Sequence, residues 1–247
     1  MNGAALLRAL TRAVLVLTVL VVAATATLWA TQRPRFDFRR IVVRGDLRHV
    51  SRAEIRDAIA GQLKGNFLTM RLAEARAAFE TIPWVASASV RRVWPDVLVV
   101  TMVERRAIGV WDDGRVLSDE GVLFDANPEE AGLDGPQIEF SGPARLAGDA
   151  VGKLHAFAGA LGSVHEVVAR VAISDRSSWS VHTATGRIFE LGRDDPPGSV
   201  EERLDAVVDG YPAVLARLNG PPGYVDARYN NGFAAMGFEK NRGPRNP

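Results

Sequence analysis

The feature that most constrains this chain is an uncharged, apolar stretch close to its start. From Ala13 to Ala30 no residue is charged, and the first half of the stretch reads AVLVLTVLVV. A helix of this length at about 1.5 Å per residue reaches roughly 27 Å, close to the ~30 Å of hydrocarbon in a bilayer. Trp29 stands where an aromatic residue meets the membrane interface. We therefore predict a transmembrane helix over residues 13–32, after a cytoplasmic tail of residues 1–12.

Two alternatives for this stretch stay open at the level of sequence. A cleaved signal peptide would end at the small residues Ala24-Thr25-Ala26, whereas a buried soluble helix fits less well because no polar face is visible. The arginines after the stretch outnumber those before it, so charge counting alone leaves the orientation open. A short basic tail before a single span usually exports a large remainder, and we expect the residues after about 32 in the periplasm.

Composition removes several classes of function. The chain has 247 residues and a formal net charge of +1, from 30 Lys and Arg against 29 Asp and Glu, which is far from the basic surface that nucleic-acid binding needs. It contains no cysteine, so disulfides, thiolate zinc sites, iron–sulfur clusters and cysteine nucleophiles are excluded. Its 47% hydrophobic content is that of a folded globular protein.

Residues 36–105 predict a small module with the order β-α-α-β-β. A strand ends at Gly45, and Ser51 with Glu54 forms a capping box that opens a helix. A second helix spans Leu72 to Thr81 before Pro83. Two apolar, β-branched runs follow, Val85 to Val93 and Val97 to Val103, joined by a turn at Trp94-Pro95-Asp96.

This order, with four short motifs, resembles a POTRA (polypeptide-transport-associated) domain. The motifs are Ile41-Val-Val-Arg-Gly45, Ile82-Pro-Trp-Val85, Val90-Arg-Arg-Val-Trp-Pro95 and Val103-Glu-Arg105. In the FtsQ/DivIB family of cell-division proteins a POTRA domain follows one membrane span, as it does here. An ordinary βααββ sandwich with the same order is the alternative. We expect Trp84 to pack on the core, the alternative being an exposed contact for a partner.

Residues 106–238 read as short strands separated by turns, with two helices. The predicted strands are 108–111, 116–117, 122–124, 167–173, 179–183, 187–191, 224–229 and 233–238. Gly148 to Gly162 has helical spacing, and a second helix begins at a capping box of Ser199 and Glu202. Pro212 should kink or end this helix. Residues 239–247 predict a flexible tail.

The second module resembles the β domain of FtsQ, in which strands continue from the POTRA sheet and two helices pack on the result. The likeness rests on Leu191-Gly-Arg193, Gly210-Tyr-Pro212 and the run from Val225 to Ala234. The predicted fold class is thus α+β: a transmembrane helix, a POTRA domain, then a β domain with a mixed sheet and flanking helices. The resemblance implies a single-pass inner-membrane scaffold at the division septum, and the alternative is a POTRA protein of outer-membrane assembly or polypeptide secretion.

No group of side chains has the spacing of a catalytic or metal site. The four histidines, His49, His155, His165 and His182, fall in different predicted elements. Gly148 to Lys153 lacks the spacing and the Ser or Thr of a phosphate loop. The aspartate pairs at 112–113 and 194–195 stand beside turn-forming residues. We therefore predict neither an enzyme nor a cofactor or metal, although a secreted hydrolase is a third class to test.

The resemblance also implies where partners bind. Members of the family contact FtsB at the last strand pair, and FtsB and FtsL-like proteins are the expected partners, with other divisome proteins reached through the POTRA domain. The residues implied as partner-binding are Arg176, Arg228, Tyr229, Asn231, Gly232, Phe233 and Ala235. An exposed sheet edge offers backbone groups that an incoming strand can satisfy. The alternative is a plain hairpin with a half-buried Tyr229 and a Gly232 that serves only its turn.

Overall fold

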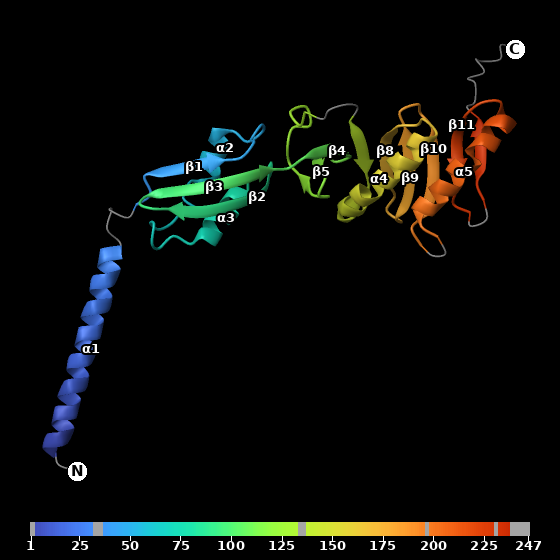
Figure 1. The fold of residues 1–247 in the computed structure, drawn as a ribbon. Helices are drawn as coiled ribbons and strands as arrows, with labels where there is room; N and C mark the ends of the chain where they lie inside the picture. The colour runs from blue at the N-terminus through green and yellow to red at the C-terminus, as the bar shows by residue number, and fades with distance from the viewer. Residues whose placement is uncertain (1–2, 32–36, 133–136, 196–197, 230–231, 238–247) are drawn as a thin grey trace. The chain divides into compact units, whose positions relative to one another are not determined.

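The computed structural model describes residues 3–31, 37–132, 137–195, 198–229 and 232–237. The chain divides into two compact units, Met1–Glu104 and Arg105–Pro247. The first unit contains a long helix and a small globular part, residues 37–104, which we call the first module. Residues 105–237 form the second module. Figure 1 shows these parts in colours that run from blue at the N-terminus to red.

Helix α1 runs from Gly3 to Thr31, and its described side chains are exposed. It contains residues 13–31 of the predicted helix, whose last residue lies outside the described ones. It begins well before residue 13, because the preceding residues are mainly alanine, leucine and arginine, which favour helix. Within the described part of the chain, no helix combines the length and the apolar character needed to cross a membrane.

The first module has the predicted order of elements. They are β1 (Arg40–Arg44), α2 (Arg52–Ile59), α3 (Leu72–Glu80), β2 (Val85–Val93) and β3 (Val97–Glu104). In the sheet, β3 lies between β1, to which it is parallel, and β2, to which it is antiparallel. Helix α3 packs on β2 and against α2, so the module has one layer of helices and one of strands (Figure 1).

Local signals in this module behave as predicted. Ser51 and Glu54 form the capping box, in which the Ser51 hydroxyl accepts from the Glu54 N–H at 3.1 Å. Trp84 is buried, with 4% of its surface exposed, and its ring stacks on His49 at 4.0 Å between centroids. The core position predicted for Trp84 is therefore confirmed. Phe79 and Val85 belong to the buried cluster of the same module.

The strands of the second module form one nine-stranded mixed sheet. They are β4 (Ala107–Trp111), β5 (Val116–Ser118), β6 (Leu123–Phe124), β7 (Ile138–Ser141), β8 (Val168–Ile173), β9 (Ser178–Thr183), β10 (Ile188–Arg193), β11 (Pro222–Asp226) and β12 (Ala234–Gly237). Their order across the sheet is β12-β11-β10-β9-β8-β7-β4-β5-β6. The sheet of the first module is separate from this one. The continuous sheet implied by the resemblance is thus wrong for the described strands.

Strand β7 was not predicted, although it lies in the middle of the sheet. It pairs in parallel with β4 on one side and β8 on the other. Its four residues are too few to show a period of two, and Gly142-Pro143 follows at once, which is typical of a turn. Phe140 is buried on this strand, and the strand completes the sheet only through partners distant in sequence.

Two helices cover one face of the sheet (Figure 1). Helix α4 (Ala147–Ser163) packs on β8, and α5 (Val200–Leu218) packs on β10, β11 and β12. The predicted capping box at Ser199 is present at the start of α5. Pro212 does not end this helix, which continues to Leu218. The proline is exposed, whereas its neighbour Tyr211 is buried in the core. Packing of Tyr211 therefore stabilises the helix although proline has no backbone N–H to donate to the preceding turn.

Candidate partner-binding edge of the second sheet

Strand β12 forms one edge of the nine-stranded sheet, and β11 is its neighbour there. The pairing is antiparallel, with Val225 opposite Ala235 and Asp226 opposite Ala234. In such a strand, alternate backbone N–H and C=O groups point to the partner and away from it. Part of the backbone of Ala234–Gly237 is therefore directed away from β11, as required for another strand to add at this edge.

Strand register places the predicted partner-binding residues at one end of this sheet. Ser178, at the start of β9, pairs with Arg193 at the end of β10, and β11 runs parallel to β10. The turn before β9, which contains Arg176, therefore lies at the same end of the sheet as the last residues of β11 and the first residues of β12. Segments far apart in sequence thus meet there.

The side chains at this end differ in exposure. Arg176 and Arg228 are exposed, and Tyr229 has 61% of its surface exposed, so the half-buried position considered for Tyr229 is wrong. Gly232 is exposed and has φ of +153°, a conformation that favours glycine. Asn231 lies outside the described residues. The exposed tyrosine and arginine are the side chains best placed to meet a partner.

Phe233 and Ala235 have inward-facing side chains. Both are partly buried and pack against the core of the module. A Cβ added at Gly210 on α5 would come within 2.7 Å of the Phe233 ring, so the ring rests on the helix backbone at this glycine. The Gly210-Tyr211-Pro212 motif therefore provides the surface on which the start of β12 packs. These two residues hold the edge strand in place, and only their backbone faces outward.

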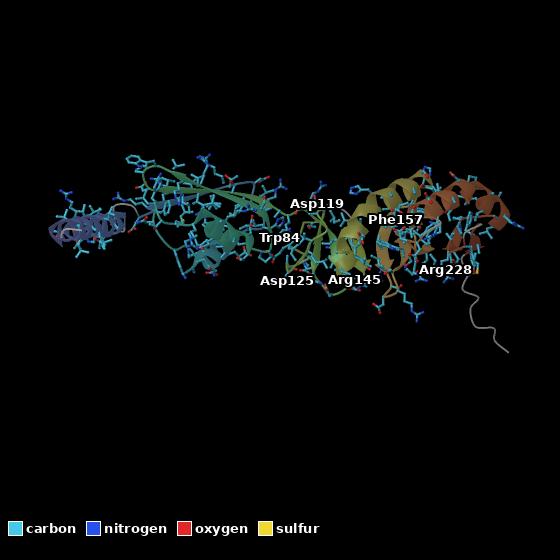
Figure 2. All side chains as sticks on the ribbon, turned by 90° about the horizontal axis from the view of Figure 1, so that it is seen from below. Trp84, Asp119, Asp125, Arg145, Phe157 and Arg228 are labelled. Atoms are coloured by element: carbon cyan, nitrogen blue, oxygen red, sulfur yellow. The ribbon has the colours of Figure 1, made fainter. Side chains whose placement is uncertain are left out.

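Arg228, which is labelled in Figure 2, is held in position by the carboxylate of Asp226. Its Nε donates to Asp226 Oδ1 at 2.8 Å and its Nη2 to Oδ2 at 2.6 Å. These hydrogen bonds hold the pKa of the largely buried Asp226 below its ordinary value and raise the pKa of Arg228. The paired guanidinium stays charged, and its remaining N–H groups are available to an acceptor on a partner.

Gly192 on β10 makes room for the Arg228 side chain. Its φ is +78°, and the strand has a register shift between Glu190 and Gly192. A Cβ at Gly192 would lie 3.1 Å from Arg228 Cγ. The bulge thus turns the end of β10 and leaves space for the arginine to cross it.

Arg203 on α5 fixes the loop that leaves β10. Its Nε donates to the Leu191 carbonyl at 2.7 Å, its Nη1 to the Gly198 carbonyl at 2.9 Å, and its Nη2 to the Arg193 carbonyl. One guanidinium therefore satisfies three carbonyl groups and ties the strand end to the start of α5.

Two hollows flank these residues on the helix side. A pocket of about 180 Å³ lies among Ala227, Tyr229, Gly232 and Phe233, with Glu202 and Arg203 on its polar side. Its apolar wall suits a single hydrophobic side chain from a partner.

The second hollow, of about 670 Å³, has Arg176 and Trp179 in its wall. Lys153 spans it, with Nζ at 2.7 Å from Asp194 Oδ2 and 2.6 Å from Glu201 Oε1. Burial favours the neutral lysine, but the two carboxylates outweigh burial and raise the pKa of Lys153. With Lys153 held by the two carboxylates, Arg176 and Arg193 are the exposed cationic residues in the wall of this hollow.

Comparison with known proteins accounts for both modules. The family model for the FtsQ-type POTRA domain matches residues 36–105, and the model for the C-terminal domain of cell division protein FtsQ/DivIB matches residues 109–228. Cell division protein FtsQ of Burkholderia pseudomallei is 40% identical over 88% of this chain and 86% of its own length. The chain belongs to the FtsQ/DivIB family. The Nitrosospira multiformis and Bordetella pertussis FtsQ proteins are 36% and 33% identical over 85% and 91% of the chain, covering 87% of each relative.

Membership in the FtsQ/DivIB family fits the architecture, an α+β fold of a POTRA domain and a mixed-sheet domain with helices. The C-terminal family model ends at Arg228 and so includes Arg176 but not Tyr229 or the β12 strand. The candidate edge thus lies partly beyond the region that the model defines.

The described residues contain no group of three or more His, Asp or Glu side chains that could hold a metal ion. Burial lowers the pKa of His182, and the nearby Arg170 lowers it further. The structural role of Arg203 was not predicted from sequence, because a single arginine on a helix has no recognisable pattern. Gly192 and Gly210 belonged to motifs that marked the family, but what they touch became clear only in the structure.

Proposed function

We propose that this chain is a non-enzymatic scaffold of the cell-division machinery, anchored in the inner membrane by α1 with both modules in the periplasm. The observation that supports this best is the position of β12 at the edge of the described sheet, beside which Arg228 and Tyr229 are exposed. A strand from a partner would add to this edge through backbone hydrogen bonds. FtsB and FtsL-like proteins are the partners that we propose.

The anchor is supported by the character of residues 13–32. The apolar side chains of α1 that the structure describes, at residues 10–26 and 29, are exposed, with Leu17 63% exposed. An isolated helix with such a surface has no favourable position in water, whereas lipid would cover it.

The anchor is tested by replacing Leu17 and Val21 together with Arg. Each charge at the centre of a span costs roughly 2.5 to 3.5 kcal/mol on insertion scales, so the variant should leave the membrane fraction. The matched control replaces Arg48 and Arg52, exposed residues of the first module, with Gln. Normal retention of the doubly charged variant in the membrane would contradict the anchor.

Strand addition is tested by a pair of prolines. Because neighbouring residues of an edge strand alternate in direction, one of Ala235 and Met236 directs its N–H outward. Proline at that position is tolerated by the fold, whereas proline at the other removes a hydrogen bond to β11. The variant that keeps the wild-type melting temperature should lose binding to a partner peptide. Undiminished affinity in that variant would rule out strand addition.

The side-chain part of the site is tested separately. Arg228→Gln breaks the pair with Asp226, and Tyr229→Ala removes an exposed ring, so both should weaken partner capture. Arg217→Gln on α5 is the control, because Arg217 is exposed and belongs to the last turn of that helix. Equal capture by all three variants would limit recognition to the backbone.

A further inference from the structure

One end of the first module displays large apolar side chains that the core does not use. Trp94, in the turn between β2 and β3, has 80% of its surface exposed, and Leu68, in the connection from α2 to α3, has 48%. A tryptophan with so large an exposed surface is uncommon in a soluble fold, whereas tryptophan is enriched where protein meets the lipid interface. Leu68 adds a second apolar side chain from a different segment.

Both residues belong to the end at which the chain enters the module. Arg40, the first residue of β1, pairs with Val97, and the Arg39 N–H donates to the Asp96 carbonyl at 3.0 Å, so the β2–β3 turn lies beside the chain entry. The rings of Phe38 and Phe67 are 5.8 Å apart between centroids, which brings the segment of Leu68 there as well. Figure 1 shows the β2–β3 turn and the start of β1 at the same end of the sheet.

The charged residues at this end carry a small positive excess, with Arg39, Arg40 and Lys64 against Asp37 and Asp96. Arg40 and Lys64 are exposed, and neither forms an ion pair with any residue that the structure describes. Arg39 is largely exposed and its contact with Asp96 is long, at 3.7 Å. Basic residues close to a bilayer surface are attracted to anionic lipids by about 1 kcal/mol each.

Chain length keeps this end near the membrane. Residues 32–39 connect α1 to the module and span at most about 28 Å when fully extended. We propose that this end, with Trp94 and Leu68 in the interface and Arg39, Arg40 and Lys64 at the headgroups, docks on the surface of a bilayer rich in anionic phospholipid. The inference rests on the proposed anchor α1 and adds a second, peripheral contact that limits how the module can turn above the membrane.

The experiment uses single-cysteine reporters in the full chain, which has no cysteine of its own. The chain is reconstituted into vesicles of phosphatidylethanolamine and phosphatidylglycerol, and an environment-sensitive fluorophore is attached at Leu68→Cys. Val103→Cys is the matched control, since Val103 is 57% exposed in the same module but stands near the far end of β3. Leu17→Cys reports on the anchor. Quenching by brominated lipid then measures contact with the bilayer directly.

We expect brominated lipid to quench the reporters at Leu17 and Leu68 but not the one at Val103. Adding Trp94→Ser should abolish most quenching at Leu68. Arg40→Gln should lower the equilibrium constant for docking by about fivefold, and phosphatidylcholine vesicles should lower it further. Quenching at Leu17 with none at Leu68 would overturn the docking alone and point to a protein partner for this end. Absence of quenching at Leu17 would overturn the anchor. Absence of quenching at both Leu17 and Leu68 would overturn the anchor and the docking together.

Discussion

The two modules use opposite charges for the same purpose. In the first, the Glu104 carboxylate at the end of β3 accepts the backbone N–H groups of Arg48, His49 and Val50, each at 2.9 to 3.0 Å. In the second, the Arg203 guanidinium donates to three backbone carbonyls around the end of β10. Each side chain thus fixes the segment that leads into a helix, α2 in one module and α5 in the other.

The Glu104 carboxylate and the Arg203 guanidinium differ in how their charge responds to pH. Burial would raise the pKa of Glu104, but the N–H groups of Arg48, Val50 and His49 outweigh burial and lower it below its ordinary value of 4.5. Arginine stays charged throughout the accessible pH range. Acid can therefore neutralise the carboxylate that stabilises the first module. The guanidinium that stabilises the second module stays charged. Four substitutions, taken from the largest expected effect to the smallest, test this contrast.

Trp84→Ala should have the largest effect, because the ring is buried and stacks on His49, in the segment that Glu104 holds. Truncation of a buried tryptophan costs about 3 to 5 kcal/mol, so the first module should unfold at a much lower temperature. Trp94→Ala is the control and should stay within about 0.5 kcal/mol of wild type in detergent, since Trp94 is exposed. Calorimetry of the full chain measures both, and equal melting of the two variants would place Trp84 outside the core.

The two tryptophans also show how far sequence reasoning extends. The order of the first module was predicted completely, because its signals are local: the capping box at Ser51, the helix stop before Pro83 and two apolar runs around one turn. The burial of Trp84 followed from its place between a helix and a strand. These signals act over a few residues, where propensity and capping decide the structure.

The strands of the second module were predicted apart from β7, although β11 ends at Asp226 and not at the predicted Tyr229, and the sheet order was not predicted. Parallel pairing of β7 with β4 and β8, and of β10 with β11, joins segments separated by whole helices, and no local pattern specifies such partners. At Pro212 the local signal for a helix end was overridden, since α5 continues to Leu218 and the neighbouring Tyr211 is buried. In the candidate site, Arg228 and Tyr229 were predicted from the family likeness, whereas the roles of Asp226 and Arg203 emerged only from contacts in space.

Arg203→Met tests the cationic side of the comparison. Hydrogen bonds to charged groups contribute about 1.5 to 3 kcal/mol each in favourable cases, and water can replace part of them here, so we expect a loss of about 2 kcal/mol in the second module. The loss should be the same at all pH values. Arg176→Met is the control, since Arg176 is exposed, and should lower partner binding without changing the melting temperature. A wild-type melting temperature for Arg203→Met would show that the three carbonyls need no guanidinium.

Glu104→Gln tests the anionic side. A glutamine still offers one oxygen to the three N–H groups, so we expect a loss of about 1 to 2 kcal/mol near neutral pH. Because the folded-state pKa of Glu104 is lowered, its contribution is fully present above 4.5 and disappears as the pH falls through the folded-state value.

The gap between wild type and Glu104→Gln should therefore close in acid, while the gap for Arg203→Met stays open. Unfolding in denaturant across a pH series measures both gaps. A Glu104→Gln gap that is constant with pH would mean that the carboxylate charge contributes nothing to holding the segment of His49.

Gly192→Ala should have the smallest effect on stability and the most selective effect on function. Its positive φ costs an alanine about 1 kcal/mol, and the new Cβ would press on Arg228 at 3.1 Å from Cγ. Gly186 has a similar φ of +81° with no neighbour within 4 Å, so Gly186→Ala reproduces the backbone strain without touching the arginine. Both variants should have a slightly lower melting temperature than wild type, but only Gly192→Ala should also bind a partner more weakly. If the two variants bind equally well, the position of the Arg228 side chain does not matter for recognition, and contact at this edge reduces to the backbone of β12.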